Sequence, residues 1–198
     1  MKRFLIVLTV FVVAIAFAGC KNDNEHKAAS FLSGILENRE AFIDEDGNSV
    51  YLKDYVVKAN ENVRFTPQKY AAVDFDGDNA DESVLYGSPD YGVYLVFHHV
   101  DKKTYGFEFT ERELINLKSD GTFIQSSGAD INSFVNLEFS GSGYSIKEAA
   151  YKDGLNKEYR LFGSAAAKES VNAYIDDFDK KHNVTWFYLE ELSGETDQ

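Results

Sequence analysis

Between residues 70 and 162 the chain alternates short runs of β-branched and aromatic residues with a few turn-forming residues. Val, Ile, Tyr and Phe suit the pleated, half-buried surface of a sheet, and strands that recur about every ten residues favour antiparallel pairing. The runs expected to be strands are 70–75, 82–86, 91–100, 103–110, 134–139, 144–151 and 158–162. This pattern predicts an antiparallel β-sheet meander.

Two segments have the apolar spacing of amphipathic helices. In the first, the apolar residues are Phe31, Leu32, Ile35, Leu36 and Phe42. In the second, 165–181, they are Val171, Tyr174, Ile175 and Phe178. Ser164 is expected to cap the second helix, and a shorter helix is expected over 111–118. The sequence therefore predicts an α+β fold in a single globular domain, 29–192, with the N-terminal and the C-terminal helix on one face of the sheet.

The start of the chain has the layout of a secretory signal peptide. Two basic residues follow the first methionine, and residues 4–17 form an uncharged, apolar run. This run has about fourteen residues, fewer than the roughly 20 that a membrane-spanning helix needs. It ends in two small residues directly before Cys20. We therefore expect residues 1–19 to be removed as a signal peptide.

The tetrapeptide Phe17-Ala18-Gly19-Cys20 resembles the lipobox of bacterial lipoproteins, with phenylalanine where leucine is usual. The resemblance implies that Cys20 receives a diacylglycerol and becomes the acylated N-terminus. Two or three acyl chains anchor a protein stably, whereas one chain binds only marginally. Residues 20–28 would then be the lipidated cysteine and a polar tether. The expected location is the extracytoplasmic face of the cell membrane, within the cell envelope.

The cysteine content and the net charge limit the kinds of site and partner that the protein can have. Cys20 is the only cysteine, so its lipidation leaves no thiol for a disulfide, a zinc site or nucleophilic catalysis. Removing Lys2 and Arg3 with the signal peptide changes the formal net charge from −13 to −15, which repels nucleic acid. The membrane, reached through the lipid anchor, is the expected partner. A protein or a glycan partner stays open, and 193–198 is expected to be a disordered tail.

Residues 74–82 have the composition and spacing of a metal-binding loop. Carboxylates stand at positions one, three, five and nine, and a backbone carbonyl is available at position seven. The expected ligands of a hard cation such as Ca²⁺ are Asp74, Asp76, Asp78, Ala80 and Glu82. Asn79 occupies position six, where the backbone needs a positive φ that asparagine tolerates better than most residues. An acid-rich hairpin turn with solvated carboxylates is the alternative.

The loop is not an EF-hand, because Leu85 stands at position twelve, where an EF-hand has a bidentate glutamate. It resembles instead the single calcium loops between strands in integrin-type and related extracellular β-repeat proteins. That resemblance implies a structural Ca²⁺, bound with a dissociation constant on the order of 10⁻⁴ to 10⁻³ M as in extracellular modules. The ion would make the hairpin rigid rather than carry a signal.

The mature chain as a whole resembles a group of small, uncharacterised lipoproteins of anaerobic Gram-positive bacteria. The motifs that carry the resemblance are YAAVDFDGD at 70–78, DYG at 90–92, YGF at 105–107, LKSDGTF at 117–123 and NVTW at 183–186. It spans most of residues 28–189. It implies a cell-surface lipoprotein with an α+β domain, and it implies no catalytic activity.

Two classes of function remain. The first is a non-enzymatic module that binds a ligand or a partner at the cell surface, and the sequence favours it, because no Gly-x-Ser-x-Gly elbow is present. The alternative is a small envelope hydrolase that works through carboxylates. His98 and His99 would point to opposite faces of a strand and cannot share a metal. An exposed aromatic cluster, if present, is expected near the acidic turn: Tyr86, Tyr91 and Tyr94.

Overall fold

The computed structural model describes residues 32–58, 63–87 and 92–189. The expected signal peptide, Cys20 with its tether, and the C-terminal tail lie outside the described residues, as do 29–31 and 190–192 of the expected domain. Within the described part, no helix is both long and apolar enough to cross a membrane.

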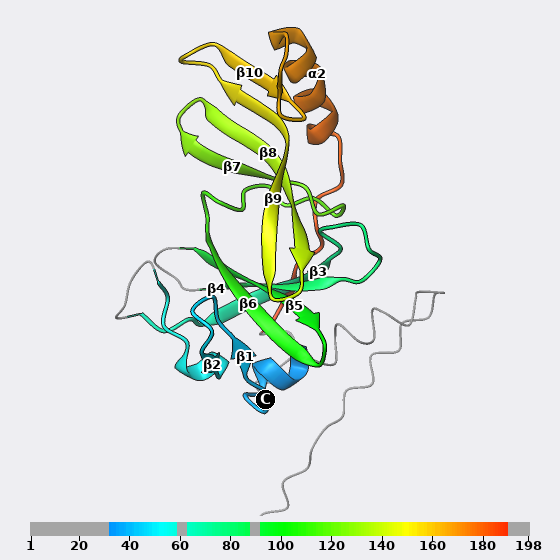
Figure 1. Ribbon diagram of the computed structural model, residues 1–198. Coiled ribbons are helices and arrows are strands. Elements are labelled where there is room, and N and C mark those ends of the chain that lie inside the picture. Colours follow the sequence, from blue (N-terminus) through cyan, green and yellow to red (C-terminus); the bar gives the residue numbers. More distant parts are fainter. Residues whose placement is uncertain (1–31, 59–62, 88–91, 190–198) are drawn as a thin grey trace, which may run out of the picture.

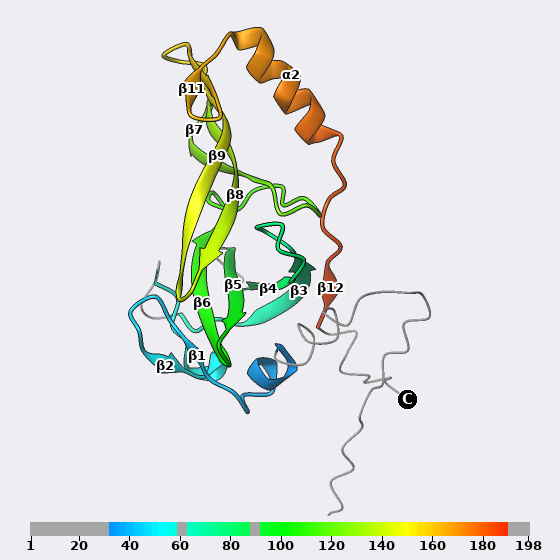
Figure 2. The ribbon, with the colours of Figure 1, turned by 45° about the vertical axis from the view of Figure 1, so that its right-hand side comes forward.

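The strands form two sheets. The first has the spatial order β12 (Phe187–Tyr188), β3 (Pro67–Val73), β4 (Glu82–Gly87), β5 (Val93–Val100), β6 (Lys103–Thr110), β1 (Phe42–Ile43) and β2 (Ser49–Val50). The second has the order β11 (Ser164–Ala165), β10 (Glu158–Leu161), β9 (Gly143–Asp153), β8 (Ile131–Ser140) and β7 (Phe123–Gly128). Figures 1 and 2 show the second sheet rising from the first.

The predicted antiparallel pairing is confirmed, but the prediction of one continuous meander is wrong. All strand neighbours are antiparallel except β1 and β6, which pair in parallel through Ile43 and Tyr105. In the first sheet β1 is therefore the neighbour of β6 on the side away from β5. The chain that follows β6 leaves this sheet and forms the second one.

The first sheet is buried on both faces, which accounts for the almost continuous apolar sequence of its central strands. Along β5, Val93, Leu95 and Phe97 pack on one face against the N-terminal segment. Tyr94 and Val96 on the other face join a core that the second sheet completes. The core residues that the N-terminal segment contributes are Leu32, Ile35, Phe42, Leu52, Tyr55 and Val57.

The second sheet is built around the long β8–β9 hairpin (Figure 2). One part of this hairpin packs on the first sheet, and another part packs on a helix. Val135 and Leu137 lie in the core shared with the first sheet. Phe134 instead packs against the helix α2 (Lys168–Asp179), with its ring centroid 5.0 Å from that of Phe178. The strand register shifts between Phe134 and Val135, which marks the change of packing partner.

The helices differ from the prediction in position and extent. The α2 stripe is confirmed, since Val171 and Phe178 are buried, but α2 covers the second sheet and not the first. It begins at Lys168, and Ser164 lies in β11 rather than at its cap. At the other end of the molecule, residues 32–36 are helical and pack on the first sheet. The expectation that both helices cover one face of one sheet is therefore corrected.

Two local predictions also change. Phe42, expected in the first helix, belongs to β1. Further along, the short 3-10 helix η1 (Leu52–Asp54) follows β2. Residues 111–118 form turns instead of a helix. Their backbone is used by the second sheet, because Ile115 and Ile124 exchange two N–H···O bonds of 2.9 and 2.8 Å along the outer edge of β7.

Two connecting segments join the sheets. One leads from β6 to β7, and the other returns from α2 to β12 at the far edge of the first sheet (Figure 2). They bridge each other at Lys118 and Asn183. The Lys118 side chain is 3% exposed and donates from Nζ to Asn183 Oδ1 over 2.9 Å. The return segment is therefore fastened at the base of the second sheet before it enters the first.

Candidate metal site

The acidic loop connects β3 to β4. Val73 and Glu82 are the last residues paired across the two strands, so residues 74–81 are free of sheet geometry. Gly77 and Asn79 take positive φ values of 79° and 65°. Asn79 thus adopts the backbone conformation that the sequence predicted for position six of the loop.

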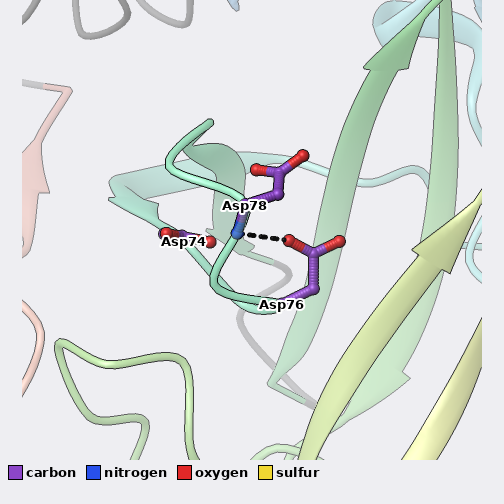
Figure 3. A group of neighbouring side chains, drawn as sticks. All are labelled: Asp74, Asp76 and Asp78. Atoms are coloured by element: carbon purple, nitrogen blue, oxygen red, sulfur yellow. Dashed lines mark hydrogen bonds between the residues drawn. The ribbon is translucent and has the colours of Figure 1, made fainter.

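The loop brings three of the predicted ligands together (Figure 3). One carboxylate oxygen from each of Asp74, Asp76 and Asp78 lies within 4.8 Å of the other two. Calcium–oxygen distances are about 2.3–2.6 Å, so oxygens at this separation can bind one cation between them. Asp74 and Asp76 are half-buried and Asp78 is exposed. This group can hold a metal ion.

Backbone amides hold the three carboxylates in position. Asp74 accepts hydrogen bonds from the N–H groups of Gly77, over 2.8 Å, and Asn79, over 3.0 Å. Asp76 accepts from the Asp78 N–H over 3.1 Å, the contact drawn in Figure 3. Asp78 in turn accepts from the Ala80 N–H over 2.7 Å. These bonds fix the side chains without a cation, so they are equally compatible with the acid-rich turn that the sequence left as the alternative.

Glu82, the predicted ligand at position nine, lies outside the group of three. Its side chain is 3% exposed and accepts a hydrogen bond of 3.2 Å from the Phe75 N–H. Its second oxygen lies 3.1 Å from His98 Nδ1. Burial raises the pKa of Glu82, and the hydrogen bonds from His98 and Phe75 oppose that rise. Glu82 therefore holds the loop in place through the Phe75 N–H and is not a member of the acidic group.

The loop also contacts the second sheet. Phe75 is 1% exposed, and its ring lies edge-on to Phe123 and Phe139, with centroids 6.1 and 6.3 Å away. The Phe75 carbonyl accepts from Asn136 Nδ2 over 3.3 Å, and Asp76 Oδ2 accepts from the Phe139 N–H over 3.4 Å. A residue of the acidic group is thus bonded directly to β8.

Gly121 shows how closely the two parts approach. A Cβ atom at this position would lie 2.5 Å from the Phe75 Cα, and its φ is 77°. Only glycine meets both conditions without displacing the loop. The acidic loop is therefore part of the junction between the sheets rather than a free hairpin.

An aromatic cluster exists, but at the opposite end of β4 from the acidic loop. Tyr86 and Tyr94 lie 4.9 Å apart between ring centroids, and Trp186 packs against both. Lys69 Nζ lies 4.6 Å from the ring centroids of Tyr86 and Trp186. Tyr91 is outside the described residues. Trp186 could not be assigned to this cluster from the sequence, because it comes from the distant segment before β12.

The Tyr86 hydroxyl donates to Glu111 Oε1 over 2.7 Å. This hydrogen bond to a carboxylate, helped by partial burial, raises the pKa of Tyr86 to about 12. His98 and His99 take different partners, Glu82 and Thr104. The two histidines therefore have separate contacts, in agreement with the prediction that they point to opposite faces of the strand.

Comparison with protein-family models, with curated proteins and with solved structures gives no match. The function is therefore inferred from the residues and their geometry. Among the described residues, Asp74, Asp76 and Asp78 form the group of acidic or histidine side chains that meets the spacing of a metal site.

Proposed function

We propose that the protein is a lipid-anchored cell-surface module that binds a ligand or a partner without catalysis, and that one Ca²⁺ in its acidic loop stabilises the fold. The observation that carries the calcium proposal is the convergence of Asp74, Asp76 and Asp78 in a loop that joins both sheets. The anchor rests on the sequence around Cys20, which resembles a lipobox.

The chemistry of the loop favours calcium over other ions. All the converging ligand atoms are carboxylate oxygens, the ligands of hard cations, whereas zinc prefers thiolates and imidazoles. Calcium also accepts six to eight ligands in irregular geometry, so water and the Ala80 carbonyl can complete its shell. Glu82 would have to leave His98 and the Phe75 N–H to join them. We therefore assign Asp74, Asp76 and Asp78 as the main ligands.

The proposed role of the ion follows from the position of the loop. Three carboxylates so close together repel one another, and a bound cation removes that repulsion. The second oxygen of Asp76 reaches the Phe139 N–H of β8. Calcium would therefore stabilise the contact between the two sheets as well as the turn.

Calcium titration of the chain from residue 20 onward, with Cys20→Ser to prevent lipidation, tests the proposal. At 10 mM Ca²⁺, a dissociation constant of about 0.1–1 mM stabilises the native state by about 1.4–2.7 kcal/mol and raises Tm by about 3–10 °C. Asp78→Ala should lose most of this rise. Asp177→Ala, the same change at an exposed position on α2, should keep it. An unchanged Tm and no calorimetric heat in the unsubstituted protein would leave the loop as a plain turn.

A further inference from the structure

A shallow groove lies between the β1–β2 turn, β6 and the tip of the β8–β9 hairpin. Its volume is about 360 Å³, within the range of small-molecule sites. Its aromatic side chains are Tyr105 and Phe107 of β6 and Tyr144 of β9. Its acidic side chains are Asp44 and Glu45, from the β1–β2 turn. The groove thus brings aromatic rings and carboxylates together.

The aromatic side is fixed by the core beneath it. Phe107 is 4% exposed, and the Tyr144 ring stands edge-on to it with centroids 4.9 Å apart. Tyr105 and Tyr144 are half-buried, and neither hydroxyl makes a hydrogen bond to any residue that the structure describes. A ligand can therefore meet both rings and both hydroxyls without breaking a bond within the described fold.

The groove is acidic. Among the residues that the structure describes, its lining contains no lysine, arginine or histidine. The nearest described cation in an ion pair with this turn is Lys58, whose Nζ lies 3.1 Å from Glu45 and 3.4 Å from Asp46. Lys58 thus pairs with two of the three consecutive carboxylates at 44–46, whereas the Asp44 carboxylate accepts hydrogen bonds from Asp46 and Asn48 within the turn. With one amine against three carboxylates, the net charge of the turn stays negative.

The negative field reaches the aromatic side. The pKa of Tyr144 is raised, first by burial and then by the negative charges of Glu45 and Glu113, while Lys58 opposes the rise. A negative field at the hydroxyl of Tyr144 disfavours an anionic ligand and favours a cationic one.

We propose that this groove binds the alkylammonium group of a small organic cation. Aromatic faces attract such groups by about 0.5–2 kcal/mol, and the carboxylates of the groove supply the countercharge. A neutral sugar could stack on the rings and donate hydroxyl hydrogen bonds to the carboxylates, but it would gain no charge attraction from them. The inference gives the proposed binding role a ligand class and rests on that role. It uses none of the calcium-loop residues, so the two proposals can fail separately.

Choline chloride is the probe, and 3,3-dimethylbutan-1-ol is its uncharged isostere. Each is titrated into the Cys20→Ser chain at constant ionic strength with EDTA, and tyrosine ring resonances are followed by NMR. Choline should bind with a dissociation constant on the order of 1 mM. The alcohol should bind about 2- to 30-fold more weakly, the fold-change that the cation–π range corresponds to. Equal binding of the two, binding of neither, or binding of N-acetylglucosamine in place of choline would overturn the proposal.

Matched variants locate the site. Tyr144→Leu should abolish measurable choline binding, whereas Tyr188→Leu, on β12 at the opposite edge of the first sheet, should not change it. Because Tyr144 also packs in the core, Glu45→Gln provides the second test. It should weaken choline several-fold and leave the alcohol unchanged; an unaltered preference for choline would contradict the assignment. Asp78→Ala should bind choline normally, which separates this result from the calcium test.

Discussion

Replacing Phe75 should reveal how much of the stability resides at the junction of the two sheets. Phe75 is 1% exposed and is surrounded by the rings of Phe123 and Phe139. Truncating a buried phenylalanine to alanine costs about 3–5 kcal/mol, because apolar contact is lost and a cavity remains. The free energy of unfolding of a native domain is only about 5–15 kcal/mol in total. Phe75→Ala should therefore remain folded in water, but only with a narrow margin.

Urea unfolding followed by circular dichroism measures this loss. With an m-value of about 1–3 kcal/mol/M, the loss of about 3–5 kcal/mol should lower the midpoint by about 1–5 M. Phe162→Ala is the matched control, since Phe162 is 74% exposed and its truncation should change stability by no more than about 0.5 kcal/mol. A cost below about 1 kcal/mol for Phe75→Ala, or an equal cost for the control, would refute the view that Phe75 joins the sheets.

Two further predictions concern the junction and the aromatic cluster. Gly121→Ala should destabilise the protein by more than about 1 kcal/mol, because its Cβ would meet the Phe75 backbone and its φ is 77°; an unchanged urea midpoint would contradict the close approach. The raised pKa of Tyr86, about 12, means that the folded state keeps a proton that the unfolded state loses near pH 10. Stability should therefore fall between about pH 10 and 12, and less steeply in Glu111→Gln; identical slopes in the two proteins would argue against this hydrogen bond.

Local chemistry was predicted from the sequence where neighbouring residues decide it. The apolar stripe of α2, the antiparallel pairing and the positive φ of Asn79 all follow from short-range patterns. The convergence of three aspartates was predicted because the spacing and the hydrogen bonds within their own loop favour it.

The features that could not be predicted from the sequence depend on contacts between distant segments. The parallel pairing of Ile43 with Tyr105, which adds β1 beside β6, leaves no periodic signal in either segment. The helical spacing over 111–118 was misleading, because this backbone bonds to β7. Glu82 had the spacing of a ligand, but His98, brought alongside on β5, takes one of its oxygens. In each case tertiary contacts override the local pattern.

The pairing of β12 with β3 determines the order in which the strands of the first sheet can assemble. Phe187 and Tyr70 are partners across these strands, although the whole second sheet lies between them in the chain. The first sheet therefore gains its last strand only after the second sheet and α2 have been synthesised. Until then, the edge of β3 that β12 covers is unpaired. An unpaired strand edge offers open backbone N–H and C=O groups to any neighbouring chain, so the late pairing with β12 is what closes β3 to edge-to-edge association.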